Sequence, residues 1–221
     1  MVQIKESTLS FLADLKANND REWFAANRKR YEDSRENFYS FVQVLINSIG
    51  TFDPSIRGLE VSNCTYRINR DIRFSIDKSI YKTHFGAFIV KGGKKNGDKY
   101  AGYYFHVEPG NHSLIVGGAY KPPSEWLSAI REKIDDQGDL LMKIIKDREF
   151  ARYFRSIEGE KLKTAPRGYP ANHKHIELLK MKSYLIACEI PDNQIVSRAC
   201  INFVVNASRT MKPFNDFLNE Y

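Results

Sequence analysis

Apolar residues in the first fifty positions recur every three or four residues, which is the spacing of one helix face. They are Leu9, Phe11, Leu12 and Leu15 in a first stripe, and Phe24, Tyr31, Phe38, Val42, Leu45 and Ile49 in a second. The first stripe ends at residues 18–19, and Gly50 follows the second. We therefore expect two helices, the first capped by Ser7 or Thr8 and the second capped by Asp20.

The middle of the chain alternates apolar and polar residues, which is the period of a β-strand. Such runs cover 85–89, 100–107 and 114–116, and turn sequences rich in Gly, Asn and Asp separate them. Strands joined by short turns pair with their neighbours, so we expect an antiparallel meander. The Gly-Gly-Lys-Lys turn at 92–98 joins two strands, whereas a phosphate-binding loop joins a strand to a helix. We therefore interpret this turn as a hairpin loop.

Helical spacing returns in the last hundred residues. The expected elements are a helix from 124 that Gly138 interrupts, helices near 150–154 and 176–180, a strand at 184–190, a helix capped by Asp192, and a final turn from Pro213. Helices at both ends of a central run of strands indicate the α+β class. The sequence therefore predicts one domain over residues 1–221, with a central antiparallel sheet flanked by N-terminal and C-terminal helices.

Charge and cysteine content narrow the class of protein. The formal net charge of +7 favours anionic partners, either small phosphate- or carboxylate-bearing molecules or nucleic acid. Acidic residues are interspersed with the basic ones, so charge alone selects none of these partners. Three cysteines without a CxxC pair suit a reducing compartment, and the sequence shows neither a signal peptide nor a long apolar run. We therefore expect a cytoplasmic protein without a membrane partner.

Residues 66–84 hold the densest set of basic and aromatic side chains. If the first half of this segment is a strand, Arg67, Asp71 and Arg73 share one polar face. Guanidinium groups bind phosphate or carboxylate as planar forks, so this face is typical of an anion site. The candidate ligand-binding residues are Arg67, Arg70, Arg73, Lys78, Tyr81, Lys82 and His84, with Arg167 from a later loop, and the candidate catalytic bases are Asp71 and His106.

The residues alone do not exclude other classes of function. Arg and Lys interleaved with Tyr and Phe could also stack on the bases of nucleic acid and neutralise its phosphates. The same charges could instead form an internal salt-bridge network in a structural or protein-interaction domain. If the site is catalytic, we expect hydrolysis or transfer at a phosphoryl or carboxyl group. His173 and His175 with Glu177 could supply metal ligands, but two histidines two residues apart diverge on a helix, so we expect no metal there and no cofactor.

The run from Arg70 to His84 resembles the signature of a bacterial family of uncharacterised proteins, the domain of unknown function 2461. Further similar pieces are Phe11-Leu12, Asn18-Asn19, Trp23-Phe24, Gly102-Tyr103-Tyr104, Gly117-Gly118, Pro166-Arg167-Gly168-Tyr169 and the run from Pro213 to Leu218. The sequence departs from the signature at Ile80, where the family has proline, so this loop is expected to be less rigid. The resemblance implies no activity, substrate or cofactor, and it supports the choice of this segment.

Overall fold

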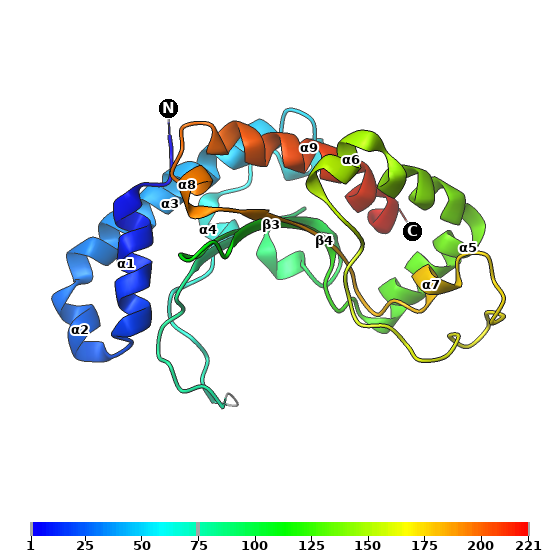
Figure 1. Ribbon diagram of the computed structural model, residues 1–221, viewed down its shortest axis with the longest axis horizontal. Coiled ribbons are helices and arrows are strands. Elements are labelled where there is room, and N and C mark those ends of the chain that lie inside the picture. Colours follow the sequence, from blue (N-terminus) through cyan, green and yellow to red (C-terminus); the bar gives the residue numbers. More distant parts are fainter. Residues whose placement is uncertain (1, 74–75, 221) are drawn as a thin grey trace.

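The computed structural model describes residues 2–73 and 76–220. Within these residues the centre is a four-stranded antiparallel sheet in the order β1-β2-β3-β4 (Figure 1). The strands are β1 (Phe85–Ile89), β2 (Gly102–Val107), β3 (Ser113–Ala119) and β4 (Tyr184–Ile190). Short turns join the first three strands, and a long helical segment precedes the fourth. The expected meander and the α+β class are therefore confirmed.

Helices come before the strands, between β3 and β4, and after the strands in the chain, and the long helices lie on one side of the sheet (Figure 1). They are α1 (Glu6–Ala17), α2 (Arg21–Ala26), α3 (Arg28–Ile49), α4 (Val61–Cys64), α5 (Ser124–Lys146), α6 (Arg148–Tyr153), α7 (Ile176–Leu179), α8 (Asp192–Ile195) and α9 (Cys200–Asn219), with 3₁₀ turns η1 (Pro54–Ile56) and η2 (Lys94–Asn96). Among the described residues, none of the helices has both the length and the apolar character that crossing a membrane requires. α3 and α9 pack on the sheet, α5 packs on α9, and the other face of the curved sheet points away from them (Figure 1).

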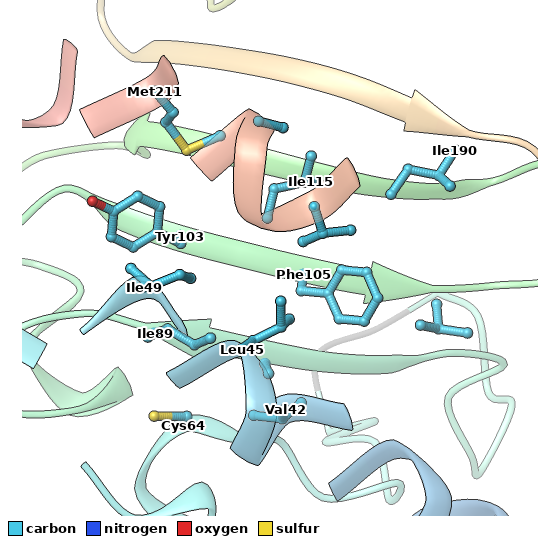
Figure 2. Close-up of a cluster of buried hydrophobic side chains, with 14 of the residues drawn as sticks. Val42, Leu45, Ile49, Cys64, Ile89, Tyr103, Phe105, Ile115, Ile190 and Met211 are labelled. Carbon is cyan, nitrogen blue, oxygen red and sulfur yellow. The ribbon is translucent and has the colours of Figure 1, made fainter. Parts of the chain in front are cut away.

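The core lies between the sheet and the helices α3 and α9 (Figure 2). The odd-numbered residues Tyr103 and Phe105 of β2 are buried there, and the Phe105 ring stacks on Phe41 of α3 with 5.1 Å between the ring centroids. In β3, a Cβ at Gly117 would lie 2.3 Å from Sδ of Met211 in α9. Glycine therefore allows the helix to approach the sheet closely. Since side chains alternate along a strand, the even-numbered residues of β2 are left for the opposite face.

The N-terminal helices differ from the expectation at their boundaries. α1 begins upstream of the expected cap, and the Thr8 hydroxyl donates to Oδ1 of Asn37 in α3. Asp20 caps α2 as predicted, because its carboxylate accepts from the backbone N–H of Trp23. A break at Asn27, with φ −105° and ψ 18°, divides the expected long helix into α2 and α3. The apolar stripe does not show this break because its residues on both helices face the same core.

Two expected helix boundaries in the second half of the chain are absent from the structure, and a third is shifted by one residue. α5 continues through Gly138 with a kink at Gln137, whose φ is −125°. Glycine is needed there because a Cβ would lie 2.3 Å from the ring of His175. Asp192 is the first residue of α8, and its carboxylate accepts from backbone N–H groups of the β2–β3 turn. Pro213 lies inside α9. Contacts with distant parts of the chain override the local signals at these positions.

Backbone bridges lie along both outer strands of the sheet in the described chain. Beside β1, the backbone N–H of Tyr66 donates to the carbonyl of Gly86 at 3.0 Å. Beside β4, Glu158 and Leu185 exchange two backbone hydrogen bonds of 2.7 and 3.0 Å. The segments that precede β1 and β4 in the chain therefore cover part of each sheet edge.

Candidate functional site

A cleft of about 840 Å³ lies on the face of the sheet opposite the helices. Its floor includes Val116 and the glycines Gly102 and Gly118, which pair across β2 and β3. A Cβ at Gly102 would lie 2.7 Å from the carbonyl oxygen of Ile89, and one at Gly118 would lie 1.9 Å from that of Tyr184, so glycine allows the neighbouring backbone to approach closely at both positions. The walls and the rim carry the aromatic residues Tyr66, Phe88, Tyr104 and Tyr120, the four lysines Lys82, Lys94, Lys95 and Lys121, and the acid Asp98.

The four lysines give the rim of this cleft its charge. In the part of the chain that the structure describes, none of them forms an ion pair with a carboxylate. Nζ of Lys82 donates to the carbonyl of Arg67 at 2.9 Å, and Nζ of Lys94 donates to the carbonyl of Ser62 at 2.8 Å. Burial, followed by the nearby charge of Arg67, lowers the pKa of Lys82. The backbone contacts hold the two ammonium groups in place without neutralising them.

A row of polar side chains from β2 continues from the wall of the cleft. The hydroxyl of Tyr104 lies 3.0 Å from Nδ1 of His106, and Nε2 of His106 lies 3.0 Å from Oε2 of Glu108. Their even-numbered positions place all three on the open face. Gly86 of β1 pairs with His106, and a Cβ there would lie 2.7 Å from the Tyr104 hydroxyl oxygen. The absence of that side chain therefore leaves room for the tyrosine ring.

His84, which directly precedes β1, lies against this row. Its ring stacks on the ring of His106 with 4.3 Å between the centroids and 30° between the planes. The neighbouring Thr83 donates from its hydroxyl to Oε1 of Glu108 at 3.2 Å. His84 also lines a second cleft of about 550 Å³, and most of the other residues around that cleft belong to the segment 66–84. Residues of β2 and residues that directly precede β1 or follow β2 thus form a compact cluster, and His84 lines both clefts.

Burial sets the protonation states in this cluster. Burial, and after it the adjacent His106 ring, lowers the pKa of His84 to about 4. Burial also lowers the pKa of His106, although the hydrogen bond with Glu108 acts in the opposite direction. For Glu108, burial acts to raise the pKa, but the hydrogen bond and charge of His106 outweigh it, and the pKa is lowered. Burial raises the pKa of Tyr104 to about 12. At neutral pH the cluster therefore holds two neutral imidazoles, a carboxylate and an intact phenol.

The described residues of the segment 66–84 form an irregular hairpin and not the strand expected for its first half. Asn69 and Tyr81 form an isolated bridge between its two arms. Further out, Oδ1 of Asp77 accepts from both the backbone N–H and the hydroxyl of Ser79, at 2.9 and 2.6 Å. Side-chain hydrogen bonds of this kind compete with the ladder of a sheet. The alternation of the sequence therefore does not produce two regular faces here.

The hairpin pairs its own charges. Arg73 donates to both carboxylate oxygens of Asp71, at 3.0 and 2.7 Å, and Arg70 forms an ion pair with Asp77. The hydrogen bonds with Arg73 lower the pKa of Asp71, which makes this carboxylate an ion-pair partner and a poor base at neutral pH. Lys78 donates to a backbone carbonyl of the hairpin at 3.2 Å. These groups form the internal salt-bridge arrangement that the sequence left open as an alternative.

Comparison with known proteins identifies the family of the chain. A family model described as a conserved hypothetical protein (DUF2461) matches residues 7–217. The chain belongs to this family. The resemblance seen in the sequence is therefore confirmed at the level of the DUF2461 family. No curated protein and no solved structure matches the chain.

The structure of this DUF2461 chain brings only part of the expected site together. Lys82 and His84 line the large cleft, and the second cleft is lined by both of them together with Arg70, Asp71 and Tyr81. Tyr81 is only 8% exposed, and its ring stacks on Phe24 of α2 with 4.0 Å between the centroids, so it anchors the hairpin. The segment between α6 and α7, which holds Arg167, lies at the opposite end of the molecule from the hairpin (Figure 1). The structure thus separates Arg167 from the other expected residues.

The remaining expected residues lie on the hairpin or outside the described chain. Arg67 is exposed on the hairpin, and Phe74 and Ser75 of the expected strand lie outside the described residues. Sequence reasoning missed the cleft of this DUF2461 chain, although one signal was present. In the run Gly102-x-Tyr104-x-His106-x-Glu108, every second residue points to the same side. The run therefore places a glycine, a phenol, an imidazole and a carboxylate on one face. The lysines of the rim come from turns, and no periodicity marks them.

Proposed function

We propose that the open face of the sheet binds a small anionic ligand with a flat or apolar body, in the class of phosphorylated or carboxylated metabolites. The observation that supports this proposal is an aromatic-walled cleft whose four lysines have no carboxylate partner among the described residues. Aromatic faces pack against a flat body, and ammonium groups attract a phosphate or carboxylate. The volume of about 840 Å³ falls in the range of small-molecule sites, roughly 300–1,000 Å³.

The charges of the hairpin favour this location over the one expected from the sequence. An anion that binds Arg70 or Arg73 competes with the carboxylate of Asp77 or Asp71. An anion on the sheet face displaces no such partner. Replacing the carboxylate on an arginine of the hairpin with another anion gains little binding free energy. The lysine rim is therefore the better site for an anionic ligand.

A thermal-shift screen with nucleotides, sugar phosphates and aromatic carboxylates tests the proposal. A ligand present at a hundredfold excess over its Kd stabilises the native state by about 2.7 kcal/mol, which is measurable as a shift in Tm. The best compound is then titrated by calorimetry into wild-type protein and into a double variant, Lys95→Gln with Lys121→Gln. Both lysines are exposed, so the substitutions remove charge from the rim without removing packing.

The matched control is Lys143→Gln with Lys146→Gln, which removes the same charge from exposed positions of α5. Loss of a charge-assisted contact is expected to weaken binding at least about tenfold in the cleft variant, and the control is expected to bind like wild type. Equal losses in both variants would show non-specific attraction and contradict the proposal. Binding of single-stranded oligonucleotides without binding of any small anion would favour the nucleic-acid alternative.

A further inference from the structure

The cluster of His84, His106 and Glu108 has the composition and spacing of a metal site. Each residue offers one ligand atom, and these three atoms all lie within 4.8 Å of one another. Among the described residues, this is the group of three such side chains that could hold a metal ion. Ligand atoms at about 2.0–2.2 Å from a shared ion stand roughly 3–3.5 Å apart, so modest side-chain rotations bring them into position. Nε2 of His106 and Oε2 of Glu108 already lie 3.0 Å apart.

The surroundings of the cluster match what holds a metal-ligating histidine in place. Such a histidine binds the ion through one nitrogen and donates a hydrogen bond from the other to a protein acceptor. Nδ1 of His106 lies 3.0 Å from the Tyr104 hydroxyl, so Nδ1–H can donate to the phenol oxygen while Nε2 faces Glu108 and the ion. Thr83 holds the second carboxylate oxygen of Glu108 at 3.2 Å. These contacts would orient two of the three ligands.

A simple hydrogen-bonded chain explains only part of this arrangement. Tyr104, His106 and Glu108 satisfy one another without an ion. That chain leaves out His84, whose ring nitrogens have no hydrogen-bond partner among the described residues although the ring packs against His106. The His84 ring is half-buried and lines both clefts, so its nitrogens are open to a ligand from the cleft. A cation bound there would join His84 to the other two residues.

We propose that His84, His106 and Glu108 bind a divalent transition-metal ion, with Tyr104 as a positioning residue behind His106. Two imidazoles and one carboxylate are typical of Zn²⁺ and Fe²⁺ sites, whereas Ca²⁺ and Mg²⁺ prefer sites made of oxygen ligands alone. Three protein ligands leave a coordination position open, as in catalytic zinc sites. His84 lines both clefts, so a ligand in either cleft could reach an ion bound to it. The metal site does not depend on the anion site, because it is tested with the ion alone.

The experiment is a titration of the full chain, treated with a chelator and then dialysed, with Zn²⁺ alone by competition against a coloured zinc indicator. Wild-type protein is expected to bind one ion per chain, and Ca²⁺ is expected not to compete. Glu108→Gln and His84→Ala are expected to lower the affinity at least a hundredfold. Tyr104→Phe keeps all three ligands and is expected to lower it by about 10–100-fold, the usual effect of removing such a partner. Co²⁺ in place of Zn²⁺ gives a visible spectrum that reports its ligands and is expected to change in the His84→Ala protein.

His112→Ala is the matched control, because His112 is an exposed histidine of the β2–β3 turn outside the cluster. It is expected to bind Zn²⁺ like wild type. His84→Ala is the decisive variant, since His84 has no hydrogen bond to lose in the described structure, and circular dichroism checks that it is folded. The proposal is overturned if wild type binds less than one ion per chain. It is also overturned if folded His84→Ala binds like wild type, or if His112→Ala loses the ion.

Discussion

Removing the side-chain amide of Asn19 is expected to release the hairpin of residues 66–84 from the N-terminal helices. Asn19 lies between α1 and α2, and its side chain forms two hydrogen bonds with the backbone of Tyr81: Nδ2 donates to the carbonyl at 3.0 Å, and Oδ1 accepts from the N–H at 2.9 Å. Beside them, the Tyr81 ring stacks on Phe24. A neutral hydrogen bond contributes about 0.5–1.5 kcal/mol, so Asn19→Ala is expected to weaken docking of the hairpin by about 1–3 kcal/mol.

Amide hydrogen exchange followed residue by residue measures this docking, because it detects local opening separately from global unfolding. A loss of 1–3 kcal/mol corresponds to exchange about 5–150-fold faster at the amides of Tyr81 and Lys82. The Lys82 amide donates to the carbonyl of Ile68 at 2.8 Å, so it reports whether the two arms of the hairpin also separate. The amide of Phe105 in β2 reports global opening and is expected to accelerate less.

Asn18→Ala is the control for this experiment, since the Asn18 amide donates only within its own helix, to the carbonyl of Asp14 at 2.9 Å. It is expected to leave exchange in the hairpin unchanged. Wild-type exchange rates at Tyr81 in the Asn19→Ala protein would refute the assignment of Asn19 as the anchor. Equal acceleration at Phe105 would show that the hairpin opens only with the whole domain.

Three further predictions concern stability and protonation. Tyr103→Phe removes the hydrogen bond from the Tyr103 hydroxyl to Oδ2 of Asp53. Urea denaturation is expected to show a decrease of about 1.5–3 kcal/mol in the free energy of unfolding. An unchanged free energy would mean that water replaces this bond without loss of stability. Gly117→Ala places a methyl group against Met211 and is expected to lower the free energy of unfolding by about 1–3 kcal/mol, whereas an unchanged midpoint would show that α9 moves freely. In the metal-free protein, NMR is expected to place the pKa of His84 near 4 and not 6.5. The unfolded chain then binds more protons between these values, so stability falls as the pH is lowered through this window; titration near 6.5 would contradict the burial of the ring.

The sheet could be predicted from the sequence because its signals are local. Each strand has its own alternation, and the turn at 109–111 separates β2 from β3 by only a few residues. Helix boundaries were less predictable where distant contacts decide them. Gly138 looks like a helix end in the sequence, and the reason for the glycine is the ring of His175, which lies far away in the chain.

The candidate site could be predicted only in part because several segments supply it. His84 was expected from the sequence, but its contact with His106 depends on the register between β1 and β2. The lysines of the rim come from the hairpin, the turn around η2 and the end of β3, which only the fold brings together. In the first half of the hairpin, spacing predicted a strand because it does not reveal that the Asp71 carboxylate accepts from the backbone N–H of Arg73.

The bridges beside β1 and β4 also determine how the domain meets other chains. A bare edge strand presents a row of unpaired N–H and carbonyl groups, onto which a peptide or a second sheet can add as a further strand. Here Tyr66 occupies such a position beside Gly86, and Glu158 occupies two beside Leu185. A partner strand would first have to displace these segments of the same chain. The fold therefore discourages growth of the sheet through its edges.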